Sequence, residues 1–261
     1  MCEDFSHSNF TVLLEVYKVA QEALYMISTL SQKCYTARKD EVSYGFPTLC
    51  DKMLTLTISI RELLLMGQDD NALCLFRVFM EACELGVVSL FEDNFTEYIE
   101  LQDDPVNQKK FWSRNIAKGN IYVVLKKILD SIDFPEDMKN SYINVHRQRK
   151  DYISGSIHLN AGSILRGSTV PSYIHKDYFV SSTLGHVSLQ APSIYYGVLD
   201  ELYYFSLVLT QSVRAENIPN LFRDMAEHNE YRFAIKSLLY FQEVYNRFDD
   251  RIVELIETDR E

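Results

Sequence analysis

The stretch NALCLFRVFMEACELGVVSLF, residues 71–91, decides the fold class of this chain. Its apolar residues cover most of the circumference of a helix rather than a single stripe. A helix that is apolar nearly all round is buried nearly all round, so we predict that residues 71–91 form the central helix of a helical core. Asp69 and Asp70, just before it, are typical of a helix start.

Apolar residues recur at helical spacing along most of the remaining sequence. This periodicity predicts further helices at residues 10–37, 49–66, 95–101, 105–131, 135–165, 193–213, 218–228 and 231–257. The chain has only 9 Gly and 6 Pro in 261 residues, which favours long helices joined by few turns. One segment, about 166–192, breaks the pattern with Gly, Ser and Pro and is predicted to be a long irregular loop. We therefore expect an all-α fold, a single long-helix bundle that this loop interrupts once.

The composition is that of an ordinary globular protein, with 47% hydrophobic and 24% charged residues. We find no internal repeat, low-complexity tract or linker that would divide the chain. We therefore expect one helical domain over residues 1–261, with a core at about 10–215 and a C-terminal helical extension at about 216–261.

The sequence carries no signal for export, for a membrane span or for a metal site. The opening residues Met1 to Asp4 lack the basic and apolar regions of a secretory signal, and no apolar run approaches the ~20 residues that span a bilayer. The five Cys are scattered, with no CxxC pair, and indicate reduced thiols that fill a core. We expect a cytoplasmic protein with no membrane partner, no metal and no cofactor.

The charge is distributed unevenly along the chain. The net charge of −11 argues against broad binding of nucleic acid. Residues 106–186, however, hold twelve Lys and Arg against six Asp and Glu, a local net charge of +6. This basic middle segment can face the phosphates of an RNA partner, or it can form solvated helix faces that pair with acids elsewhere in the fold. The sequence leaves both interpretations open.

Two charges interrupt the predicted central helix. Arg77 and Glu81 lie four residues apart and therefore on one face of the helix. Because a charge pair on a buried helix loses hydration, it needs other polar groups nearby. The pair is either an internal ion pair that fixes helix packing or one wall of a polar pocket.

A second group of polar residues follows one stripe of the predicted helix at 135–165. Arg147, Asp151, Ser154 and His158 share this stripe at about 100° per residue. A histidine with a serine and a carboxylate on its own face can act as a general acid or base. His158 can equally be a hydrogen-bonded histidine of the core, and its parallel neighbours do not form a serine-hydrolase triad.

Two short motifs carry a family resemblance. The first is LFRVFME at residues 75–81, an Arg-x3-Glu helix, and the second is YISGSIH at 152–158, a Tyr-x-Ser-x3-His helix. In this order they resemble a bacterial helical family, the domain of unknown function 5677, which is similar in turn to the HEPN class of helical domains. The resemblance covers residues 10–215 as an order of helices, and its specific part is these two motifs.

The resemblance implies a HEPN-like bundle, a homodimer, and a toxin or antiviral defence role in bacteria or against phage. Active HEPN members are metal-independent endoribonucleases that use an Arg and a His about four to six residues apart, the Arg against phosphoryl charge and the His for proton transfer. This chain departs from that spacing, because Asp151, Tyr152 and Ile153 occupy those positions before His158. Catalysis would then require Arg77, Arg147 or an arginine of a second subunit.

The candidate site follows from these motifs. We assign candidate catalytic roles to five residues: His158, Arg77, Glu81, Arg147 and Ser154. We assign candidate substrate-binding roles to four others: Tyr152, Arg149, Lys150 and Asp151. Three hypotheses remain: a HEPN-like ribonuclease, a non-catalytic HEPN-like module that binds RNA, a nucleotide or a protein, and a helical interaction protein whose polar residues are structural. The sequence predicts a site where the Arg77–Glu81 pair faces the helix that carries His158.

Overall fold

The structure is a computed structural model that describes residues 7–92, 95, 98, 101–157, 170–171, 179–180 and 191–258. The long helices are α1 (His7–Ala37), α2 (Gly45–Leu65), α3 (Asp69–Phe91), α7 (Glu136–Ile157), α9 (Ala191–Arg214) and α10 (Asn229–Thr258). Between them lie the shorter elements η2 (Leu101–Asp103), α5 (Pro105–Asn115), η3 (Ala117–Gly119), α6 (Asn120–Ser131) and η5 (Asn220–Met225). The predicted all-α class is confirmed.

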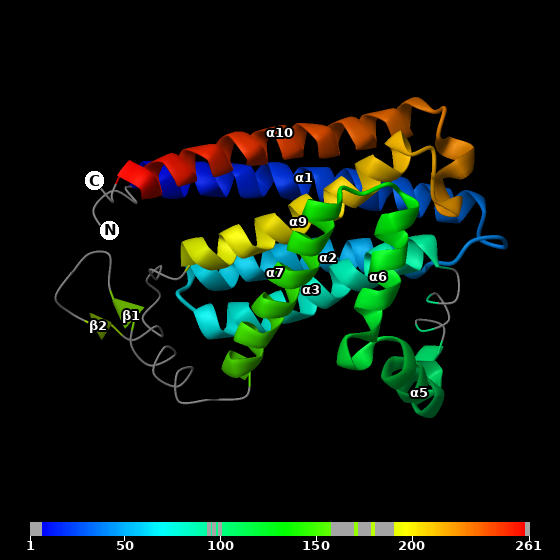
Figure 1. The fold of residues 1–261 in the computed structure, drawn as a ribbon, viewed down its shortest axis with the longest axis horizontal. Coiled ribbons are helices and arrows are strands. Elements are labelled where there is room, and N and C mark those ends of the chain that lie inside the picture. The colour runs from blue at the N-terminus through cyan, green and yellow to red at the C-terminus, as the bar shows by residue number, and fades with distance from the viewer. Residues whose placement is uncertain are drawn as a thin grey trace.

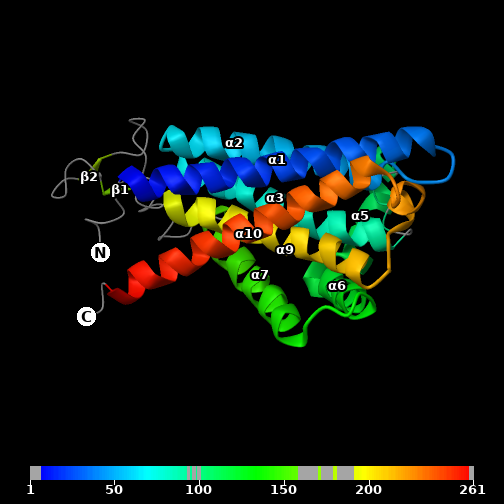
Figure 2. The ribbon, with the colours of Figure 1, turned by 90° about the horizontal axis from the view of Figure 1, so that it is seen from above.

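The long helices form a bundle with α3 inside it. Helices α1 and α10 lie side by side along one side of the molecule (Figures 1 and 2). Helix α3 contacts α2, α6, α7 and α9. Helix α7 crosses α3 and α9 steeply rather than running parallel to them (Figure 1). The central position predicted for residues 71–91 is therefore correct, and α3 starts two residues earlier than predicted.

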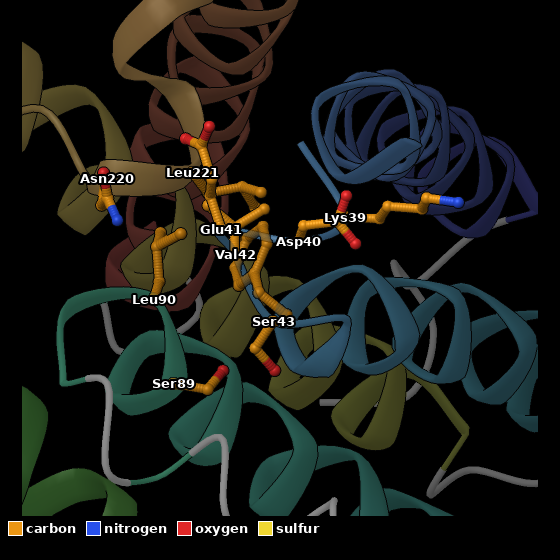
Figure 3. Close-up of a pocket in the computed structure, with 10 residues that line it drawn as sticks. Lys39, Asp40, Glu41, Val42, Ser43, Ser89, Leu90, Asn220 and Leu221 are labelled. Carbon is orange, nitrogen blue, oxygen red and sulfur yellow. The ribbon is translucent and has the colours of Figure 1, made fainter. Parts of the chain in front are cut away.

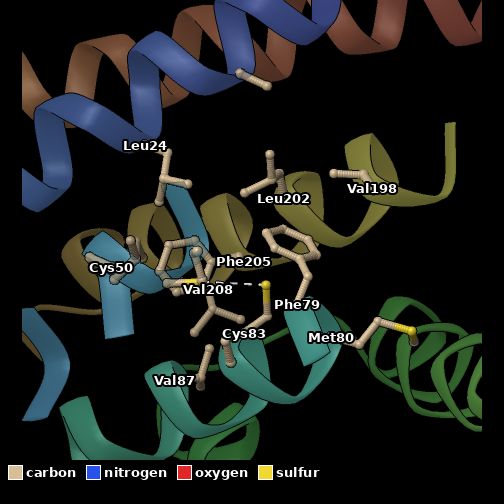
Figure 4. Close-up of a cluster of buried hydrophobic side chains, with 14 of the residues drawn as sticks. Leu24, Cys50, Phe79, Met80, Cys83, Val87, Val198, Leu202, Phe205 and Val208 are labelled. Atoms are coloured by element: carbon tan, nitrogen blue, oxygen red, sulfur yellow. Dashed lines mark hydrogen bonds between the residues drawn. The ribbon is translucent and has the colours of Figure 1, made fainter. Parts of the chain in front are cut away.

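The core forms where α3 meets its neighbours. Phe79 and Cys83 of α3 are fully buried, and Cys83 Sγ lies 3.4 Å from the sulfur of Met53 on α2. Figure 4 shows this layer, in which apolar side chains of α1, α2, α3 and α9 interdigitate. Its labelled members are Leu24, Cys50, Phe79, Met80, Cys83, Val87, Val198, Leu202, Phe205 and Val208. Burial of these side chains provides the main driving force for the bundle, as expected from the hydrophobic effect.

Helices α3 and α9 approach each other closely at Gly197. A Cβ atom added there would lie 2.9 Å from the Phe76 ring, which is closer than side-chain atoms pack. The missing side chain therefore allows α9 to lie against α3. This contact places the next turn of α9, with Asp200 and Glu201, near α3 and α7.

The predicted single helix at 105–131 is wrong. The structure has two helices there, α5 and α6, joined by the turn η3. Lys118 and Gly119 adopt left-handed conformations, with φ of 57° and 83°. Left-handed residues break the right-handed hydrogen-bond pattern of a helix, and glycine adopts this conformation without steric cost. The chain therefore turns at Gly119, and α5 and α6 become two walls around a recess.

The C-terminal part of the chain packs onto the bundle. Helix α10 buries Leu238, Phe241 and Tyr245 and lies against α1 and α9. The predicted helix at 218–228 is instead the 3₁₀ segment η5, which follows Pro219. Arg38, at the end of α1, joins η5 through Asn220 and Asp224. Residues 216–258 are thus integrated with the core by both apolar and polar contacts.

Only a small part of the predicted irregular segment, about 166–192, belongs to the described residues. Two short strands, β1 (Val170–Pro171) and β2 (Phe179–Val180), pair antiparallel within it. The other residues of that segment up to 190 lie outside the described part, as do most residues of the predicted helix at 95–101. Among the described helices, none combines the length and the apolar run that a bilayer crossing requires.

Candidate functional site

A cleft of about 610 Å³ opens between α3, the α5–η3–α6 segment and α7. We call it the cation cleft because four cationic side chains line it, from three separate elements. Those cations are Arg77 of α3, Lys118 of η3, and Arg147 and Lys150 of α7. The acidic lining residues are Glu81, Glu84 and Asp151, and the aromatic ones are Trp112 and Tyr122. The left-handed turn at Lys118 and Gly119 allows α5 and α6 to bring Trp112 and Tyr122 to the same cleft.

The Arg77–Glu81 pair lies on the α3 wall of the cleft. Arg77 Nε donates to Glu81 Oε1 at 3.1 Å, and the two side chains are 24% and 30% exposed. Arg77 Nη1 is covered from solvent and has no hydrogen-bond partner among the described residues. Buried donors are nearly always paired in proteins, so this nitrogen lacks an acceptor that a ligand or a side-chain rearrangement can supply.

The α7 wall presents cations held over an aromatic ring. The Arg147 guanidinium lies 4.6 Å from the centre of the Tyr122 ring, and Lys150 Nζ lies 5.8 Å from it. Both distances are those of cation–π contacts. Lys150 is also ion-paired with Glu84, whereas no acid among the described residues pairs with Arg147. Arg147 is exposed, so its charge remains available to a ligand in the cleft.

Behind the cleft lies a buried chain of alternating charges, which we call the His146 chain. It runs from Lys150 through Glu84, His146, Glu201 and Arg149 to Asp200. His146 Nε2 lies 2.7 Å from Glu84 Oε1, and His146 Nδ1 lies 2.6 Å from Glu201 Oε2. Both are contacts between a carboxylate and an imidazole ring, and they are ion pairs when His146 is protonated. With His146 protonated, three cations balance three anions.

The central members of the His146 chain are almost completely buried. Glu84, His146 and Glu201 are each 1% exposed. Burial alone would lower the pKa of His146, but the carboxylates of Glu201 and Glu84 outweigh it and raise the pKa to about 9. Burial opposes ionisation of Glu84 as well, yet His146 and Lys150 lower its pKa to about 2. His146 is therefore an imidazolium at neutral pH that is sealed from solvent, which does not suit a general base.

The outer end of the His146 chain joins α7 to α9 and α10. Arg149 donates from Nη1 to Glu201 and from Nη2 to Asp200, both at 2.7 Å. Tyr245 of α10 donates to the other oxygen of Asp200 at 3.2 Å. Arg149 thus serves as a fork between two carboxylates, a geometry to which guanidinium is well suited.

The structure brings together five of the nine residues predicted for the site. Arg77, Glu81, Arg147, Lys150 and Asp151 all line the cation cleft. The predicted meeting of the Arg77–Glu81 pair with the helix before His158 is therefore present in the fold.

The other four predicted residues lie elsewhere. Arg149 and Tyr152 line a second cleft of about 340 Å³, between α7 and α9. The Ser154 hydroxyl donates to the backbone carbonyl of Lys150 at 2.8 Å, so its proton is used within the helix. His158 lies outside the described residues.

Sequence reasoning missed His146, Glu84 and Glu201. The available signal was an acidic residue at a helix position whose neighbours are apolar, as in Cys83-Glu84-Leu85 and Asp200-Glu201-Leu202. A buried acid implies a buried cation, because an unpaired charge is too costly inside a protein. Nothing in the local sequence identifies His146 as that cation.

A third cavity, of about 450 Å³, lies at the α1–α2 turn beside η5 (Figure 3). Lys39, Asp40, Glu41 and Asn220 are among its lining residues. It contains none of the predicted site residues. Among the described side chains, no group of three or more His, Cys, Asp or Glu is placed to hold a metal ion.

No protein-family model matches the chain, and neither a curated protein nor a solved structure matches it. The HEPN resemblance therefore remains a hypothesis that rests on the two sequence motifs. The cation cleft provides the structural evidence about function.

Proposed function

We propose that this protein binds single-stranded RNA in the cation cleft, as a HEPN-like helical module. The observation that carries the proposal is the convergence of Arg77, Lys118, Arg147 and Lys150 on one cleft that also holds an indole ring. Proteins that bind single strands combine cations along the phosphates with aromatic rings on which bases stack. Trp112 provides such a ring in the cleft that the four cations line.

The surface next to the cleft supports the same ligand. The helices α5 and α6, which contribute to the walls of the cleft, also carry exposed cations that have no ion pair within the described part of the chain: Lys109, Lys110, Arg114, Lys126 and Lys127. Other basic residues of the middle segment are neutralised, because Lys139 pairs with Asp130 and Glu136. The helices that form two walls of the cleft are therefore basic, although the whole protein is acidic. Such a local field attracts a polyanion to one face.

Trp112 is the only tryptophan in the chain and lies in the cleft, which makes it a natural reporter. Addition of a single-stranded RNA of about ten nucleotides, enough to fill a groove of this kind, is expected to change its fluorescence saturably. Affinity is expected to fall as salt rises, because bound phosphates release counterions. An absence of any saturable change at low salt, together with an absence of RNA retention on a filter, would contradict the proposal.

A matched pair of charge reversals locates the binding. Arg147→Glu places an acid in the cleft and is expected to weaken RNA binding by at least about tenfold. Lys18→Glu makes the same change of charge at an exposed position on α1. It is expected to change affinity by no more than about twofold, because screening limits distant charges. Equal effects of both variants would indicate binding by net charge alone.

Metal-independent ribonuclease activity is the second candidate function, and it follows from the motif that ends in His158. Arg147 and Lys150, on the helix that precedes His158 in sequence, face the cleft and can hold a phosphate there. We expect the same RNA, incubated in chelator, to be cut by wild type and not by His158→Ala. If the wild-type protein binds the RNA but does not cut it, the ribonuclease function is rejected and the binding function stands. Size-exclusion chromatography in the same buffer measures the oligomeric state and tests the homodimer that the resemblance implies.

A further inference from the structure

The Arg77–Glu81 pair places a hydrogen-bond donor and a hydrogen-bond acceptor side by side on one wall of the cleft. Its guanidinium has an unpaired Nη1, and Glu81 Oε1 takes the bond from Arg77 Nε. The Glu81 side chain is 30% exposed, so its carboxylate is accessible to a ligand. The pair therefore combines a buried donor that has no acceptor among the described residues with a partly exposed carboxylate acceptor. This is the arrangement expected of a group that reads a ligand edge.

Aromatic rings lie next to this pair. Trp112 lines the same cleft, and its ring centre lies 5.9 Å from that of Tyr98. Burial raises the pKa of Tyr98, and the negative charge of Glu81 raises it further. A base stacked on Trp112 would lie in the same cleft as Arg77 and Glu81. The α7 wall carries the exposed Arg147, which can hold the phosphate.

Guanine is the base whose pairing edge matches this pair best. Its edge presents the O6 acceptor, then the N1–H and N2–H₂ donors. Arg77 Nη1 can donate to O6 after a small shift of the side chain, and the Glu81 carboxylate can accept from N1 and N2. Adenine and cytosine present a donor where O6 lies and an acceptor where N1–H lies. Uracil matches the first two groups but places its O2 acceptor against the carboxylate.

We propose that the cation cleft selects guanine, with Arg77 and Glu81 reading the base, Trp112 stacking on it and the α7 cations holding its phosphate. This proposal rests on the proposed RNA-binding function and specifies which base that site takes. A carboxylate that meets two N–H donors of one base gives discrimination, because every other base leaves the carboxylate unpaired or opposes it with an acceptor.

Isothermal titration of the wild-type chain with 5′-GMP, IMP, AMP and CMP tests the selection without any variant. GMP is expected to bind at least tenfold more tightly than AMP or CMP. IMP, which keeps O6 and N1–H and lacks only the 2-amino group, is expected to lie between them. Equal affinities for all four nucleotides would overturn the selection and leave RNA binding in place. No binding of any nucleotide or of RNA would overturn both proposals.

Glu81→Gln assigns the discrimination to a residue. It is expected to reduce the ratio of GMP to AMP affinity at least tenfold while AMP affinity stays within about twofold, since phosphate and stacking contacts persist. Glu62→Gln is the matched control, because Glu62 belongs to an exposed Arg–Glu pair on α2 with Arg61 Nη1 at 3.4 Å. An unchanged ratio in Glu81→Gln would overturn the role of the carboxylate even if wild type prefers guanine.

Discussion

The His146 chain and the Arg77–Glu81 pair lie close together in the fold, but they differ in how far their charges are buried. Glu84, His146 and Glu201 are 1% exposed, whereas the side chains of Arg77 and Glu81 are 24% and 30% exposed. A buried charge must be matched by its neighbours, since removal from water costs several kcal/mol per ion. A half-exposed charge can exchange its protein partner for water or a ligand. The first arrangement suits stability and the second suits recognition.

The largest expected effect comes from removing one anion of the His146 chain. Glu201→Ala leaves His146 with only Glu84 and Arg149 with only Asp200, so three cations of the chain face two anions. We expect a loss of about 3–5 kcal/mol in the free energy of unfolding, which is typical of a broken buried pair. Urea denaturation at neutral pH measures it.

Glu243→Ala is the control for this variant. It removes an acid whose ion pair with Arg247 is exposed on α10. The expected loss is below about 1 kcal/mol. If the two variants lost equal stability, the contrast between buried and exposed charges in this protein would be unfounded.

The next effect is a dependence of stability on pH. The pKa of His146 is about 9 in the folded chain, against 6.5 when the group is unperturbed. Because the folded value is the higher one, the stabilisation is complete below about pH 6.5 and is lost as pH rises through about 9. The loss is expected to reach about 3 kcal/mol at most, measured as the unfolding free energy along this range. In His146→Gln this part of the profile is expected to become flat, and a persistent slope would assign it to other groups.

A smaller effect tests how the fold assembles the His146 chain. Gly197→Ala adds a Cβ 2.9 Å from the Phe76 ring and should push α9 away from α3, at about 1–3 kcal/mol. Gly86→Ala adds a Cβ whose nearest neighbour is Met53 Cε at 3.4 Å. That contact is acceptable, and alanine favours helix, so the second variant is expected to be neutral or slightly stabilising. Thermal unfolding measures the stability of both variants. Equal losses of stability would show that the close contact between α3 and α9 does not require a glycine at position 197.

The smallest effect on stability is expected in the cleft itself. Glu81→Gln keeps the shape of the side chain and removes a charge that is already partly hydrated. We expect a change of less than about 1 kcal/mol in the unfolding free energy. A loss comparable to that of Glu201→Ala would show that the pair is part of the buried charge system rather than a surface for recognition.

The sequence predicted part of the site because that part is local. Arg77 and Glu81 are four residues apart, so helix geometry alone places them on one face, and the structure records their ion pair. Arg147 and Asp151 are also four apart and share the cleft. Ser154 follows the same stripe but donates to its own helix, because a mid-helix serine can bond to the carbonyl one turn earlier.

The bend between α5 and α6 could not be predicted in the same way. Apolar spacing continues through residues 105–131, and the break depends on Lys118 as much as on Gly119. A left-handed lysine is uncommon and is maintained by its surroundings rather than by its own preference. Without this bend, Trp112 and Tyr122 would not be expected to share a cleft with Arg147.

The sequence by itself determined the helices, the central place of residues 71–91 and the pairing of Arg77 with Glu81, because helical periodicity and neighbour spacing are local properties. Only the tertiary structure decided that Glu84, His146 and Glu201 meet, since they come from three helices far apart in the chain. Their charges are tolerable only in one another's presence, and no single segment carries that information. The cation cleft has the same origin, because its walls come from helices whose crossing is set by packing.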